Sequence, residues 1–267
     1  MEVAQDNQQE PLARQVLYEH PLNERVRTFL RLEYLFSQAA HHVKCASEWD
    51  SRAALTCILE ILSIFGNANL KSEVLKELER HASGLKRLEH NPDIDIRQLT
   101  GLLDVIGNHI DNLHRINGQV GSELKSSEFL ISIRQRSAIP GGTCDFDLPA
   151  FHYWLQQPAQ DRTDDLYRWL NSFDAIGQAI QFILKLTRES TTLGPAIADD
   201  GVYQKTLDPN LPYQLVRIAL PAGSPYFAEL SGGRHRFTAR FLNFSTIENR
   251  ASQTDEDVEF KLACCVI

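Results

Sequence analysis

The chain has 267 residues, of which 43% are hydrophobic, so it can bury a full core as one large domain or two modest ones. Its formal net charge is -8 at pH 7, and an acidic chain binds nucleic acid or anionic membranes poorly unless its basic residues are segregated. No apolar run approaches the roughly 20 residues of a membrane span. We therefore expect neither nucleic acid nor a membrane as a partner.

Residues 1–14 are polar and lack the apolar core of a signal peptide, so we expect a disordered leader there. The chain has five cysteines, an odd number, and no C-x-x-C motif. This usage favours reduced thiols and a cytoplasmic protein.

Residues 15–193 are expected to form an α-helical domain, because most apolar residues there recur at helical spacing. A short extended segment from Gln15 to Glu19 precedes the first helix, which Asn23 is expected to cap. Asp50 or Ser51 is the expected cap of the second helix. Two long amphipathic helices flank Asn91-Pro92, which predicts an antiparallel helical hairpin. Its apolar seams would suit either an internal bundle or a dimer contact.

The stretch from Arg134 to Leu155 predicts a helix, a tight turn, a short strand and a capped helix. The turn is Pro140-Gly141-Gly142, and the strand would run from Thr143 to Phe146. Asp147 has the position of an N-cap, with Pro149 in the first helical turn. A further long helix is expected to open at Thr163.

Residues 194–267 change to a period of two, which predicts a small antiparallel β domain. The expected strands begin at Val202, Tyr213, Arg234 and Val258. The predicted fold class is therefore α+β, with an N-terminal α-helical bundle that contains the long hairpin and a C-terminal β domain. The two extended segments at 15–19 and 143–146 could add strands to this sheet.

Residues that could carry chemistry are sparse. The chain lacks the common nucleotide-binding, zinc-protease and serine-nucleophile motifs. His41 and His42, with Cys45, make a poor metal site, because adjacent helical residues point about 100° apart. His152 could act as an acid or base with Asp147 or Tyr153, but no partner nucleophile is evident. We expect no cofactor and no metal, and keep an enzyme using His152 as the alternative function.

A stronger signal is the run Arg234-His235-Arg236-Phe237-Thr238-Ala239-Arg240-Phe241. On a strand, Arg234, Arg236 and Arg240 would share one face, while the two phenylalanines would face the core. The run from 231 to 241 contains three arginines and no acid. It could bind a carboxylate-bearing partner. It could equally be a solvated face, paired with the neighbouring strand that carries Glu259.

Several stretches together resemble the cell division protein family ZapD. In the N-terminal half they are Val16-Leu17-Tyr18-Glu19-His20-Pro21-Leu22-Asn23-Glu24, Arg27-Thr28-x-Leu30-Arg31-x-Glu33 and Leu75-Lys76-Glu77-Leu78-Glu79-Arg80. In the central stretch they are Arg134-Gln135-Arg136, Ile139-Pro140-Gly141-Gly142, Phe146-Asp147-Leu148-Pro149 and His152-x-Trp154-Leu155. Near the end they are Ser231-Gly232, Arg236-Phe237-x-x-Arg240-Phe241 and Phe260-x-Leu262-Ala263-Cys264-Cys265. The resemblance covers roughly residues 15 to 265.

This resemblance implies a cytoplasmic homodimer, with an α-helical and a β domain, at the mid-cell division ring. The implied partner is the tubulin-like protein FtsZ, bound chiefly through its C-terminal tail, and the implied activity is bundling of FtsZ filaments. The FtsZ-binding residues carried over by position are Arg236, Arg240, Arg234, Arg31 and His152. Glu128 departs from the family pattern, which can have arginine at that position of the basic groove.

Overall fold

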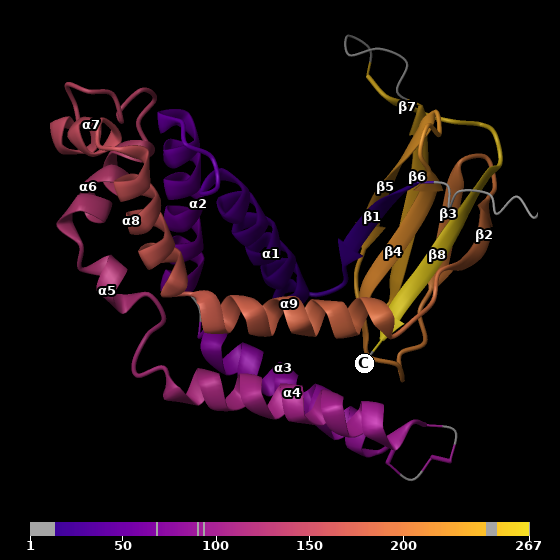
Figure 1. The fold of residues 1–267 in the computed structure, drawn as a ribbon. Coiled ribbons are helices and arrows are strands. Elements are labelled where there is room, and N and C mark those ends of the chain that lie inside the picture. The colour runs from indigo at the N-terminus through magenta and orange to yellow at the C-terminus, as the bar shows by residue number, and fades with distance from the viewer. Residues whose placement is uncertain (1–13, 68, 90, 93, 244–249, 267) are drawn as a thin grey trace, which may run out of the picture. The chain divides into compact units, whose positions relative to one another are not determined.

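The computed structural model describes residues 14–266 except for residues 68, 90, 93 and 244–249 (Figure 1). The chain divides into two compact units, each described here by itself. The helical unit is Thr28–Lys185, and the β unit combines Met1–Arg27 with Leu186–Ile267. Within the described residues, no single helix has both the length and the hydropathy of a membrane span. The predicted α+β class is confirmed, with helices toward the N-terminus and antiparallel strands toward the C-terminus.

The helices follow in chain order and are listed with their bounds. They are α1 (Glu24–His42), α2 (Glu48–Asn67), α3 (Leu70–Lys86), α4 (Ile96–Arg115), α5 (Ser122–Lys125), α6 (Glu128–Ser137), α7 (Pro149–Leu155), α8 (Ala159–Asn171) and α9 (Asp174–Glu189). The first, α1, has the predicted cap, because the Asn23 side chain accepts a hydrogen bond from the Val26 amide at 3.0 Å. The predicted hairpin is also confirmed, since α3 and α4 pack against each other (Figure 1).

Two predicted helix starts are wrong. The cap of α2 is Ser47 rather than Asp50 or Ser51, because the Ser47 hydroxyl accepts the Asp50 amide at 3.1 Å. The helix expected at Thr163 begins instead at Ala159, directly after Pro158. It also breaks into α8 and α9, where the Phe173 amide bonds back to the Leu170 carbonyl at 2.9 Å. This tight turn directs the Phe173 ring into the core, stacked 5.4 Å from the Phe65 ring.

The segment from Thr143 to Phe146 forms turns, so the predicted strand there is wrong. The Cys144 amide bonds to the Gly141 carbonyl at 3.1 Å, and the Leu148 amide to the Cys144 carbonyl at 3.0 Å. These short-range bonds keep the backbone coiled rather than extended. A Cβ atom at Gly142 would lie 2.6 Å from the Arg136 carbonyl oxygen, so only glycine fits this close approach. The cap position of α7 is Leu148 rather than Asp147, with Pro149 at the start of the helix as expected.

The described strands of the β unit form two sheets (Figure 1). The first has the order β1-β4-β8-β2, and the second has β3-β6-β5 with β7 paired to β6. The strands are β1 (Gln15–Pro21), β2 (Gly194–Ala198), β3 (Val202–Thr206), β4 (Tyr213–Pro221), β5 (Tyr226–Gly232), β6 (Arg236–Asn243), β7 (Ser252–Gln253) and β8 (Val258–Val266). The extended segment from Gln15 to Glu19 forms β1, which pairs with β4. No strand was predicted from the sequence at β2, β5 or the two-residue strand β7.

The core of the β unit lies between the two sheets. Phe241 and Ala239 of β6 pack with Ile218 of β4 and Phe260 of β8 in one apolar cluster. The Phe241 and Phe260 ring centroids lie 4.8 Å apart. Phe237 belongs to a second buried apolar cluster of the β unit, together with Leu22, Leu207 and Val216. One face of β6 is therefore held by core packing, and the opposite face is left to solvent.

Candidate functional site

The exposed face of β6 carries a row of polar side chains, Arg236, Thr238 and Arg240, which we call the arginine row. Both arginines are exposed, whereas Phe237, Ala239 and Phe241 between and beside them are fully buried. The alternation predicted for this strand is therefore confirmed. Because the aromatic face is buried in the sandwich, the two guanidinium groups project from the outer face of the sheet.

Neither Arg236 nor Arg240 has an ion-pair partner among the residues that the structure describes. Directly opposite residues of antiparallel strands share a face, so the register identifies the neighbours of the row. Arg236 lies opposite Thr206 of β3, and Arg240 lies opposite Glu229 of β5. The acid beside the row is thus Glu229. Pairing with Glu259 was a wrong expectation, because Glu259 lies on β8 in the other sheet, opposite Ile197.

Arg234 does not lie on the strand, which corrects the expectation that it shares the face of Arg236 and Arg240. The last register pair of β5 and β6 is Gly232 with Phe237. The Gly233 amide then bonds to the Arg236 carbonyl at 3.0 Å, leaving Arg234 and His235 as a two-residue hairpin turn. Arg234 is exposed at this turn, next to the start of the row.

Other arginines of the β unit have a structural role, which sets the arginine row apart. The Glu19 carboxylate accepts a hydrogen bond from Arg188 Nη2 at 2.8 Å and another from Arg217 Nε at 3.0 Å. All three side chains are largely buried, with 16–24% of each exposed. Removing either arginine would cost the Glu19 carboxylate one of its two hydrogen-bonded partners, and removing Glu19 would leave two largely buried like charges side by side. Within the part of the chain that the structure describes, Arg236 and Arg240 take no part in such a pairing.

Arg31 and His152 lie in the helical unit, and the structure does not bring them together. Arg31 is exposed on α1, 11 positions before His42 at its end, or about 16 Å along the axis. His152 is exposed on α7. The buried Arg162 donates to the Leu155 carbonyl at the end of α7 and to the Ala46 carbonyl after α1. The α7 helix therefore adjoins the end of α1 that is remote from Arg31.

Glu128, the departure from the family pattern, has a structural reason. It is the first residue of α6, directly after the cap Ser127, whose hydroxyl accepts the Leu130 amide at 3.4 Å. A carboxylate in the first turn interacts favourably with the positive end of the helix dipole.

The structure gives little support to catalysis at His152. Asp147 contacts the Cys144 thiol at 3.5 Å and Arg136 at 3.8 Å, and no hydrogen bond recorded in the described part of the chain joins it to His152. Tyr153 is 71% exposed. Burial raises the pKa of the Cys57 and Cys265 thiols to about 11, so neither is a thiolate near neutral pH.

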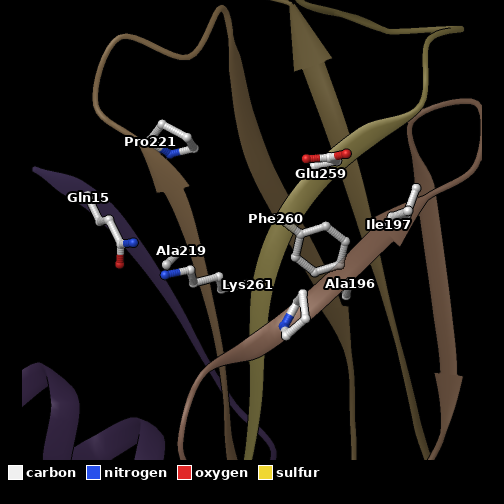
Figure 2. Close-up of a pocket in the computed structure, with 9 residues that line it drawn as sticks. Gln15, Ala196, Ile197, Ala219, Pro221, Glu259, Phe260 and Lys261 are labelled. Carbon is white, nitrogen blue, oxygen red and sulfur yellow. The ribbon is translucent and has the colours of Figure 1, made fainter. Parts of the chain in front are cut away.

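Among the cavities lined by described residues of the β unit, two bear on the candidate site. One, of about 340 Å³, lies over the sheet β1-β4-β8-β2. Its apolar walls include Pro195, together with Ile197 and Pro221 (Figure 2). Glu259 and Lys261, two residues apart on β8, place opposite charges at its edge, so it does not select for either sign (Figure 2). The second, also of about 340 Å³, is lined by Arg25 and Arg234. Sequence reasoning missed Arg25, because nothing in the local pattern places it near residue 234.

The sequence of this chain matches those of known cell division proteins. The family model ZapD, described as a cell division protein, matches residues 30–240. The cell division protein ZapD of Methylococcus capsulatus is 42% identical over 253 residues, covering 95% of this chain and 99% of the relative. The protein of the same name from Coxiella burnetii is 35% identical over 257 residues, covering 96% of this chain and 100% of the relative. The protein of the same name from Chromobacterium violaceum is 35% identical over 250 residues, covering 94% of this chain and 99% of the relative.

Proposed function

Because this chain belongs to the ZapD family of cell division proteins, we propose that it binds FtsZ, chiefly through the C-terminal tail of FtsZ. As a homodimer it would cross-link and bundle FtsZ filaments, and so promote assembly of the division ring at mid-cell in the cytoplasm. In this proposal the protein is an adaptor that performs no catalysis, and neither a membrane nor nucleic acid is its partner.

The observation that carries this proposal is the arginine row. Two exposed guanidinium groups, which have no ion-pair partner among the described residues, stand on one face of β6 in a chain with net charge -8. A guanidinium binds a carboxylate through two parallel hydrogen bonds, which makes such a row suited to an acidic peptide. The core packing of Phe237 and Phe241 holds the strand in place, so little order has to be gained on binding.

Bundling would follow from symmetry rather than from chemistry. A two-fold dimer carries one arginine row on each protomer, so one dimer can hold two filaments. Weak single contacts along a polymer gain avidity when both rows engage. Arg234, Arg31 and His152 would add further basic contacts, Arg234 beside the row and the other two on the helical unit.

Sedimentation of FtsZ filaments tests the proposal. With GTP-assembled FtsZ, the protein should appear in the pellet and raise the pelleted fraction at low centrifugal force. FtsZ lacking its C-terminal tail serves as the matched control and should retain little of the protein. If full-length FtsZ neither pellets the protein nor bundles in its presence, the proposed function is wrong.

A further inference from the structure

The cavity between the start of α1, the start of β4 and the β5–β6 turn has the features of an anion site. Its volume is about 340 Å³, and all of its described walls belong to the β unit. Arg25 reaches it from α1, and Arg234 from the hairpin turn. The described lining residues include these two arginines and no acid. Two positive charges therefore converge on one cavity in an acidic protein.

A buried amide fixes the position of one of these arginines. Gln214 is only 5% exposed, and its side-chain oxygen accepts hydrogen bonds from Asn23 at 2.9 Å and from Arg25 at 3.4 Å. The Gln214 side-chain nitrogen donates to the Pro212 carbonyl at 2.8 Å, which determines the orientation of the amide. The Arg25 guanidinium is thus held at the cavity wall before any ligand arrives, which reduces the entropic cost of binding.

The size and the walls of the cavity restrict the ligand. Ligand pockets for small molecules span about 300–1,000 Å³, so this cavity lies at the small end and admits a single side chain. Leu22 and Pro212 supply apolar wall, which suits a short aliphatic stem next to the charge. A carboxylate on a two-carbon stem matches this combination of paired guanidinium groups and apolar surface.

We propose that this cavity binds one acidic side chain of the peptide that the arginine row holds. The link is Arg234, which lines the cavity and lies two residues before Arg236 at the start of the row. The inference rests on the proposed function for the identity of the peptide, but the carboxylate site can be tested without FtsZ.

The first experiment uses N-acetylglutamate as the probe, with its α-carboxyl group blocked as the methylamide, and the full chain labelled with ¹⁵N. The arginine Nε–Hε resonances should shift saturably with this probe and not with N-acetylglutamine blocked in the same way. The response should disappear in Arg25→Gln and in Arg234→Gln. It should persist in Arg250→Gln, because Arg250 is an exposed arginine just before β7, which pairs with the far end of β6. A wild-type protein without a saturable shift would overturn the proposal.

The second experiment measures binding of a fluorescent FtsZ tail peptide by anisotropy. Arg25→Gln and Arg234→Gln should each weaken binding about tenfold, which corresponds to 1.4 kcal/mol. If both bind like wild type while Arg236→Ala is impaired, the cavity proposal is wrong and the proposed function stands. If wild type binds the blocked N-acetylglutamate but no tail peptide, the proposed function fails and the carboxylate site remains. Arg234 is exposed at a turn, so its variant decides the test even if Arg25→Gln unfolds.

Discussion

Arg240 and Glu229 lie directly opposite each other on β6 and β5, on the exposed face of the sheet, yet no ion pair joins them. Opposite charges in such cross-strand positions contribute about 0.2–1 kcal/mol when they do pair. Arg240 therefore keeps its hydrogen-bonding capacity for a partner, while Glu229 reduces the local positive charge. This arrangement predicts opposite effects of removing the two side chains.

Arg236→Ala and Arg240→Ala should leave the fold intact and weaken FtsZ binding. Each removes an exposed cation and no core contact, so stability should change by at most about 0.5 kcal/mol. Loss of a hydrogen bond between charged groups should cost about 1.5–3 kcal/mol of binding. Arg240→Glu should be worse than Ala because it adds repulsion toward an acidic partner. Thermal melting and co-sedimentation with FtsZ check these expectations.

Two controls sharpen that comparison. Glu229→Gln should bind FtsZ at least as tightly as wild type, because the acid beside the row is gone. Arg217→Ala should melt early, because Glu19 would lose a largely buried partner. If Arg236→Ala and Arg240→Ala also melt early, those arginines are structural. If they fold and still bundle FtsZ normally, the contact lies elsewhere, and Arg31 and His152 become the leading residues.

Phe237→Ala should unfold the β unit rather than weaken binding selectively. Phe237 is fully buried, and replacing a buried Phe by Ala costs about 3–5 kcal/mol. Thr238→Ala, one position along on the outer face, is the matched control and should melt close to wild type. Circular dichroism and near-UV aromatic signals follow both variants. A Phe237→Ala protein with unchanged melting would mean that this strand does not pack as described.

The sequence allowed the outer face of β6 to be predicted, because alternation is a local property of a strand. Phe237 and Phe241 define the buried side wherever the strand pairs. The neighbours of Arg240 could not be predicted, since register depends on β5, and β5 has only a weak alternating pattern. Glu259 therefore looked like a partner although it belongs to the other sheet.

The remaining errors come from turn chemistry and from contacts distant in sequence. Thr143 was expected in a strand, but hydrogen bonds three and four residues apart coil this segment. β2 was missed because Pro195 argues against a strand, although proline is tolerated on the edge strand that β2 forms. Arg25 and Arg234 line the same cavity although more than two hundred residues separate them in the sequence. No spacing rule predicts this proximity.

Binding to FtsZ should weaken as salt concentration rises. Exposed charge pairs are screened over roughly 8 Å at physiological ionic strength, and the arginine row is exposed. Co-sedimentation between 50 mM and 500 mM KCl should show a steady loss of bound protein, with FtsZ assembly itself checked in parallel. Binding that is constant across this range would rule out the arginine row as the main contact.

Acid should destabilise the helical unit partly through His109. This side chain is half-buried on α4, with its ring 5.1 Å from that of Phe182, and burial lowers its pKa. In the unfolded chain the pKa of His109 is about 6.5. As the pH decreases, His109 therefore gains its proton in the unfolded chain before it does so in the folded chain. Stability should fall as pH decreases below about 6.5, until the folded pKa is reached. His109→Gln should lose less stability than wild type between pH 7.5 and 5, whereas His114→Gln, exposed on the same helix, should follow wild type. Denaturant unfolding at each pH measures the free energy of unfolding. An equal fall of this free energy with decreasing pH in wild type and in His109→Gln would contradict the expectation.

The proposed cross-linking requires a dimer, and we expect it to form through the helical hairpin. Residues along the hairpin seams, including Leu75, Leu103 and Ile110, stay only half-buried in the single chain, and Val105 of α4 is 38% exposed. Light scattering at micromolar concentration should give twice the 30.3 kDa chain mass. Val105→Glu should give a folded monomer that still binds the FtsZ tail but no longer bundles filaments. Ile197→Glu is the matched control, since Ile197 is an aliphatic residue of the β unit that is 55% exposed, and it should remain a dimer. A monomeric wild type would exclude the cross-linking mechanism, because one arginine row cannot bridge two filaments. If Ile197→Glu were monomeric and Val105→Glu dimeric, the dimer contact would lie on the sheet rather than on the hairpin.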